Sequence, residues 1–155
     1  MTTMSGTLGY LAPEWLSLVI TEKVDVFNFG IVVIEVLCGR KNADFTQTGE
    51  CIHLLRLLEE NAKENQLHTM IDNNCDDLQL HREEVIEMMK VSVWCLQCEH
   101  SRRPSMSAVV EVLEGVMNIE PVLNYNFSFI VPSSKMMRGL LDSTPLLPSV
   151  LSGPR

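Results

Sequence analysis

The segment from Thr21 to Gly39, TEKVDVFNFGIVVIEVLCG, constrains the fold most because it is apolar on nearly every side. Its β-branched residues would also suit a buried strand, but about 15 residues exceed an ordinary strand. Thr21 and Glu22 suit a helix start, and Gly39 followed by basic residues suits a helix end. A helix that is apolar all round must be surrounded by other elements. We therefore expect the central helix of a helical domain.

Composition narrows the class of protein. A chain of 155 residues suggests one domain, and its net charge of −8 argues against nucleic-acid or anionic-membrane partners. The central segment is too short and too polar to span a bilayer, which needs about 20 apolar residues. Five cysteines form an odd set, and no basic, apolar leader opens the chain. We expect reduced thiols and a cytoplasmic location.

The rest of the chain divides by pattern into loops and helices. Residues 1–12 are typical of a loop, and Pro13 to Leu16 of a short helix with proline in its first turn. Residues 40–50 are polar and indicate a surface loop. Residues 51–60 have the apolar spacing of a helix with a charged continuation, and residues 82–97 show a stronger helical pattern. Ser105 suits the N-cap of a last helix whose apolar stripe continues to Met117. We expect units at 1–20 and 21–118, and a flexible Ser- and Pro-containing tail at 119–155, in which FSFIV (127–131) could dock.

Three motifs occur in a fixed order: GTLGYLAPEW at residues 6–15, DVFNFG at 25–30 and RRPS at 102–105. Together they resemble the C-terminal half of a protein kinase domain over residues 1–118. The sequence is most similar to plant receptor-like serine/threonine kinases, in the lectin-type S-receptor branch. The resemblance implies a mainly α fold, the helical lower lobe of a protein-kinase-like fold, lacking the β-rich N-lobe and the catalytic loop.

The resemblance implies roles for particular residues. Glu14 should form a buried ion pair with Arg103 that ties the activation segment to the last helices. Asp25 should anchor the central helix by accepting backbone hydrogen bonds from a catalytic loop. The wall that receives the substrate residue following the phosphoacceptor would consist of Thr7, Gly9 and Tyr10.

Hydroxyl groups gather before the short helix, and the resemblance makes them candidate phosphorylation sites: Thr2, Thr3, Ser5 and Thr7. Three departures from the family pattern accompany them. The family usually has Arg in place of Ser5, Pro in place of Leu8, and Tyr-Ser in place of Phe27-Asn28. The change at Leu8 bears on peptide docking.

Phosphoryl transfer needs four parts that the sequence does not contain: a glycine loop, a strand lysine, a catalytic aspartate and a magnesium-binding aspartate. We expect these parts to lie upstream of Met1 in a longer parent. The chain should hold no catalytic residue and no cofactor, since ATP and Mg²⁺ are implied only for a full-length parent. That parent would sit in the plasma membrane with its kinase domain in the cytoplasm and phosphorylate Ser and Thr. The alternative is a non-catalytic module that binds protein kinases or their protein substrates.

The missing catalytic loop and its preceding helix have a physical consequence. One flank of the central helix should face water, and Asp25 should lose its hydrogen-bonding partners. An unpaired buried polar group costs about 1–3 kcal/mol, and exposed apolar patches usually mean association. We therefore expect marginal stability or dependence on a partner.

Two metal-binding patterns in the sequence are incomplete. Acidic and amide residues fall at positions 1, 3, 5 and 12 of a calcium loop, but Asp77 stands where the sixth position requires glycine. Cys95 and Cys98 with His100 resemble half of a zinc site, and no second pair follows at ligand spacing. We predict no metal site.

Overall fold

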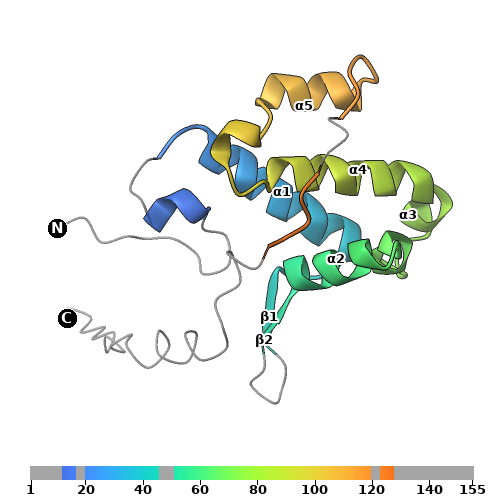
Figure 1. Cartoon of the computed structure of the whole chain (residues 1–155). Coiled ribbons are helices and arrows are strands. Elements are labelled where there is room, and N and C mark those ends of the chain that lie inside the picture. The colour runs from blue at the N-terminus through green and yellow to red at the C-terminus, as the bar shows by residue number, and fades with distance from the viewer. Residues whose placement is uncertain (1–11, 17–19, 46–50, 120–122, 128–155) are drawn as a thin grey trace, which may run out of the picture.

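The computed structural model describes residues 12–16, 20–45, 51–119 and 123–127. The described residues form a mainly helical fold, as the sequence predicts (Figure 1). None of the helices in these ranges is both long and apolar enough to cross a membrane. In chain order the elements are η1 (Pro13–Leu16), α1 (Lys23–Cys38), β1 (Ala43–Phe45), β2 (Cys51–His53), α2 (Leu54–Lys63), η2 (Leu67–Met70), α3 (Asp76–Leu80), α4 (Arg82–Cys95), η3 (His100–Arg102) and α5 (Met106–Leu113).

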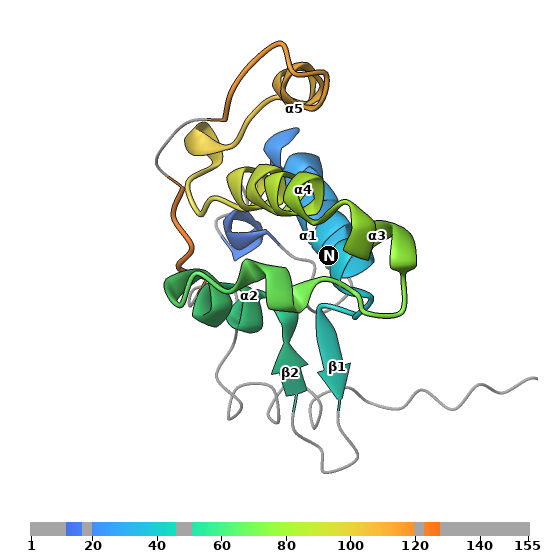
Figure 2. The same ribbon diagram turned by 90° about the vertical axis from the view of Figure 1, so that its right-hand side faces the viewer.

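Helices α1 and α4 lie side by side at the centre of the molecule (Figures 1 and 2). The buried side of α1 contributes Phe27, Ile31 and Ile34, none of which has any exposed surface. Gly30 allows the close approach of the two helices. A Cβ atom there would lie 2.9 Å from the Leu96 Cγ. The predicted central helix is therefore confirmed, and it begins and ends within two residues of the expected bounds.

The helices are arranged in three levels. Figures 1 and 2 show α5 on one side of the α1–α4 pair and α2 on the other, with the β1–β2 hairpin extending away beyond α2. The main core lies between α1, α2 and α4, and a smaller cluster lies under α5, where Val109 is fully buried against Val26, Val91 and Cys95. Buried apolar surface of this kind supplies most of the stabilisation of a domain.

One flank of α1 is open to water, so the expectation that other elements surround this helix is wrong there. Val32 is 47% exposed and Val36 is 66% exposed. The resemblance predicts an uncovered flank on this helix but does not identify the side chains that form it. Asp25 is exposed as well, so its carboxylate is hydrated and the expected cost of an unpaired buried charge does not arise.

The predicted surface loop at 40–50 is wrong at residues 43–45, which form strand β1. β1 pairs with β2 as an antiparallel hairpin, with Ala43 opposite His53. The backbone N–H of Leu54 donates to the Asn42 carbonyl at 2.9 Å, which carries the pairing up to the first residue of α2. The helix expected from residue 51 therefore begins only at Leu54.

The last helix begins as predicted, because the Ser105 hydroxyl accepts a hydrogen bond from the Ala108 N–H at 3.2 Å. The helix ends at Leu113, before the expected end of its apolar stripe at Met117, and much of that stripe is exposed. Val109 is fully buried, whereas Val110 and Leu113 are 47% and 48% exposed. α5 packs through one narrow line of side chains and leaves the remainder of its apolar surface uncovered.

Residues 123–127 belong to the folded part, so the predicted flexible tail at 119–155 is wrong for this segment. The segment runs from the α5 side of the molecule to α2 (Figure 2). Phe127 is 1% exposed within the main core, and Leu123 and Tyr125 pack against the same cluster. The aromatic side chain explains the difference, because burying a phenylalanine contributes about 2–3 kcal/mol.

Candidate functional site

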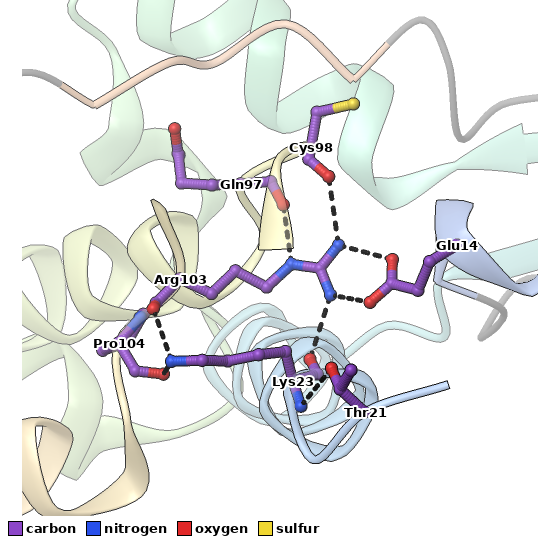
Figure 3. A network of polar contacts seen from close by, with 7 residues as sticks. All are labelled: Glu14, Thr21, Lys23, Gln97, Cys98, Arg103 and Pro104. Carbon is purple, nitrogen blue, oxygen red and sulfur yellow. Dashed lines mark hydrogen bonds and ion pairs between the residues drawn. The ribbon is translucent and has the colours of Figure 1, made fainter. Parts of the chain in front are cut away.

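A buried ion pair joins the N-terminal segment to the last helices. Glu14 lies in η1, and Arg103 follows η3 (Figure 3). The Arg103 Nη1 and Nη2 atoms lie 2.5 Å and 2.8 Å from the Glu14 Oε1 and Oε2 atoms. The Arg103 side chain is fully buried, and the Glu14 side chain is 6% exposed. The structure thus brings together the two residues that the resemblance pairs, in the bidentate geometry that suits arginine.

Every N–H group of the Arg103 guanidinium has an acceptor. Besides the two carboxylate contacts, Nε donates to the Gln97 carbonyl at 2.7 Å, Nη1 to the Lys23 carbonyl at 3.0 Å and Nη2 to the Cys98 carbonyl at 3.2 Å. The guanidinium carbon also lies 4.8 Å from the centre of the Phe27 ring. A guanidinium has five N–H donors, so full satisfaction offsets the cost of burying its charge. We call Glu14, Lys23, Gln97, Cys98 and Arg103 the Arg103 network.

Lys23 closes the network from the start of α1. Its Nζ donates to the carbonyls of Arg103 and Pro104 at 2.9 Å and 3.0 Å (Figure 3). Its backbone N–H donates to the Thr21 hydroxyl at 3.3 Å. The first turn of α1 is thereby fastened to the turn before α5. Sequence reasoning missed Lys23, because a lysine in a first helical turn carries no pattern that predicts a distant carbonyl partner.

Electrostatics keep the Glu14 carboxyl ionised. Burial raises the pKa of Glu14, but the hydrogen bonds from Arg103, a backbone hydrogen bond and the positive charge of Arg103 together outweigh it, so the net pKa lies below its ordinary value of 4.5. The charge of His100 acts in the same direction. Glu14 is therefore an anion matched to a permanent cation, and the pair is structural rather than a proton donor or acceptor.

Gln97 extends the network to residues 123–127. Its side-chain Nε2 donates to the Val93 and Asn124 carbonyls at 2.8 Å and 3.2 Å, and its Oε1 accepts from the Asn124 N–H at 3.3 Å. Three residues on, the Phe127 N–H donates to the Glu59 Oε2 at 3.1 Å. Two side chains, Gln97 just after α4 and Glu59 on α2, thus hold this segment through its backbone. Sequence reasoning missed Gln97 too, since 27 residues separate it from Asn124.

The remaining residues of the predicted site divide into two groups. Asp25 is exposed on α1. The catalytic loop whose backbone it was expected to bond is not present in this sequence. The predicted docking wall and candidate phosphorylation sites lie outside the described residues: Thr2, Thr3, Ser5, Thr7, Gly9 and Tyr10.

The described residues bring no three metal-ligating side chains together. Burial raises the pKa of the Cys95 thiol to about 12, which suits a core residue and not a thiolate ligand. Cys98 is exposed as a residue. Partial desolvation of its thiol still raises the pKa of Cys98 above its ordinary value.

Comparisons with known proteins agree with this geometry. The family described as protein kinase domain matches residues 1–113. The chain is 41% identical over 119 residues to the G-type lectin S-receptor-like serine/threonine-protein kinase SD2-5 of Arabidopsis thaliana, covering 76% of this chain and 14% of that protein. A probable LRR receptor-like serine/threonine-protein kinase of the same plant, At1g07650, is 31% identical over 159 residues, covering 99% of this chain and 16% of its own length.

A solved structure shows the same fold. The pseudokinase domain of BIR2, described as an immune regulator of the RLK/Pelle family, superposes with a TM-score of 0.59 at 23% identity. The match covers 72% of this chain and 33% of that domain. The chain therefore belongs to the protein kinase domain family, among the plant receptor-like serine/threonine kinases of the lectin-type S-receptor branch, and corresponds to the helical C-terminal lobe of that domain.

Proposed function

We propose that this chain supplies the substrate-side scaffold of a receptor-like serine/threonine kinase and transfers no phosphate by itself. The Arg103 network is the observation that carries the proposal. The activation segment of the family ends at the position of η1. The fully buried Arg103 guanidinium bonds Glu14 in η1 and the Lys23 carbonyl at the start of α1, so it fastens η1 to α1. A scaffold of this kind holds a peptide-binding segment in place without contributing to phosphate chemistry.

The residues of this chain do not fit a Mg²⁺-ATP site. The sequence has no G-x-G-x-x-G segment to cover phosphates, no His-Arg-Asp and no Asp-Phe-Gly. The described residues offer no cluster of three carboxylates or imidazoles for a divalent cation. We derive no catalytic step from this chain. ATP and Mg²⁺ would act only in a longer parent that phosphorylates Ser and Thr hydroxyls.

In such a parent the segment before η1 would receive the substrate. Thr7, Gly9 and Tyr10 would form the wall beside the phosphoacceptor. Thr2, Thr3, Ser5 and Thr7 would be regulatory sites, because a phosphate adds about −1.5 to −2 charge that pairs with basic groups. We place this domain on the cytoplasmic side of the plasma membrane, as in receptor-like kinases.

The test is a pair of measurements on the purified chain. Calorimetric titration with Mg²⁺-ATP should give no binding heat, and incubation with labelled ATP should leave the chain unlabelled. An active receptor-like kinase added in a separate reaction should label residues 1–11, and a variant with Thr2, Thr3, Ser5 and Thr7 changed to Ala should lose that label. Labelling of the chain in the absence of the added kinase would overturn the proposal.

A second candidate function is a non-catalytic module that binds protein kinases or their substrates. The exposed apolar flank of α1 favours it, with Val32 and Val36 at 47% and 66% exposure. A pull-down with a purified full-length receptor-like kinase should lose the complex on the double change Val32→Glu and Val36→Glu. The control is Leu80→Glu, at a side chain on α3 that is 79% exposed. Equal loss in the control would contradict specific docking on α1.

A further inference from the structure

A groove of about 400 Å³ lies between α4 and the chain that follows α5. We call it the α4–α5 groove. Such a volume is within the range of ligand-binding pockets, about 300–1,000 Å³. The groove is separate from the Arg103 network, which lies at the other end of α4. Its lining residues are Glu84, Glu87, Met88, Val91, Val112, Leu113, Gly115, Met117, Asn118 and Ile119.

A tight turn builds the outer wall of the groove. Gly115 has a left-handed backbone with φ of 74°, a conformation that other residues rarely adopt. The Val116 N–H donates to the Glu111 carbonyl at 2.8 Å, and the Gly115 N–H donates to the Val112 carbonyl at 3.0 Å. These two bonds form a Schellman motif, which ends α5 and turns the chain back toward α4. The wall is therefore formed by backbone hydrogen bonds before any ligand arrives.

The interior of the groove is apolar. Val91 is buried at its base, and Val112, Met117 and Ile119 are half-buried along its sides. Leu113 is 48% exposed at the opening, and the neighbouring Val116 is 73% exposed. Covering a continuous apolar surface of this kind with another apolar surface is favourable. The free energy falls by about 25 cal/mol for each Å² removed from water.

The rim of the groove is anionic. The side chains of Glu84 and Glu87 are 81% and 62% exposed. Lys90 lies 2.6 Å from Glu87, and His81 lies 3.4 Å from Glu84. Three further carboxylates next to lining residues in the sequence are also exposed: Glu83, Glu111 and Glu114. The negative charge near the opening therefore exceeds the positive charge.

We propose that the α4–α5 groove binds a basic amphipathic segment of a partner protein. Apolar side chains on one face of that segment would cover Leu113 and the groove interior, while flanking Lys or Arg residues would meet Glu84 and Glu87. Electrostatic complementarity of this kind selects the partner and speeds association. A second copy of this chain is a poorer match, because two copies that each carry a net charge of −8 repel one another.

The probe is a synthetic 14-residue peptide of Leu and Lys at helical spacing, titrated into the full chain by fluorescence anisotropy. A matched peptide with Glu in place of Lys should bind at least about tenfold more weakly, and raising the salt concentration should weaken the Lys peptide. The double change Glu84→Lys and Glu87→Lys should cost about tenfold in affinity. The control alters the net charge equally on α2 and its C-cap, through Glu60→Lys and Glu64→Lys, and should leave affinity within about twofold.

Leu113→Asp tests the apolar half of the proposal and should also weaken the Lys peptide about tenfold. Leu80→Asp on α3 is the matched control for an exposed apolar side chain. Backbone NMR signals should move at Val112, Gly115 and Met117 on binding. Equal affinity for both peptides, equal loss in the α2 control, or signal changes confined to other helices would overturn the proposal. A large gain in affinity on deleting residues 128–155, reversed by adding that peptide in trans, would identify the chain's own C-terminal segment as the occupant and overturn it too.

Discussion

Changing Glu14 to Gln removes the negative charge from the Arg103 network while nearly preserving the shape of the side chain. The fully buried Arg103 guanidinium keeps its three carbonyl acceptors but loses its counter-charge. Breaking one partner of a buried pair costs about 3–5 kcal/mol. Because three carbonyls still solvate the cation, we expect the lower end of that range, about 3 kcal/mol. This is a large share of the total stability of a domain, about 5–15 kcal/mol.

Urea unfolding followed by circular dichroism measures this cost directly. With a slope of about 1.5 kcal/mol per M, the midpoint should fall by about 2 M. The control is Glu60→Gln, which breaks the ion pair with Arg56 on α2, where the side chains are 56% and 72% exposed. An exposed pair contributes less than about 1 kcal/mol. A Glu14→Gln cost no larger than that of the control would refute the reasoning.

The reverse change gives an independent check. Arg103→Met strands the Glu14 carboxylate and also removes the donors that serve Gln97, Lys23 and Cys98. It should cost at least as much as Glu14→Gln. The double variant should lose less unfolding free energy than the two single variants lose together, because the loss of the pair interaction is then counted only once. Additive costs would show that the two side chains do not stabilise each other.

Three further outcomes are expected. The stability advantage of the natural chain over Glu14→Gln should be complete above pH 4.5 and shrink as the pH falls through the lowered folded pKa of Glu14, which urea titrations at several pH values would follow. Phe127→Ala should cost about 3–5 kcal/mol in the same assay, whereas a segment only loosely attached would lose less than 1 kcal/mol. Asn28→Ala should raise stability by about 1 kcal/mol, because the Asn28 Oδ1 is buried without a hydrogen-bond donor in the described part of the chain and alanine favours helix; a loss in thermal melting would contradict this.

The elements that sequence predicted well are those with strong local signals. The length and apolar content of α1, its terminal Gly39 and the Ser105 cap of α5 all act within a few residues. The Glu14–Arg103 pair could be expected only from the resemblance to kinases. No periodicity links two residues that are 89 positions apart.

The elements that sequence missed depend on contacts between distant segments. Strands of three residues, such as β1 and β2, are too short to show an alternating pattern. Residues 123–127 look like linker by composition, and only the burial of Phe127 and the hydrogen bonds from Gln97 order them. The apolar stripe of α5 does not show how much of it is covered: Val109 is fully buried and Val112 half-buried, whereas Val110 and Leu113 are exposed.

Gln97 takes part in two sets of contacts at once. Its backbone carbonyl accepts from Arg103, and its side chain bonds both the backbone N–H and the backbone carbonyl of Asn124. Gln97 thus connects the docking of η1 with the docking of residues 123–127, and by linkage any coupling between the two must be equal in both directions. We therefore expect a change that releases η1 from Arg103 to loosen residues 123–127, although Glu14 and Asn124 are not bonded to each other.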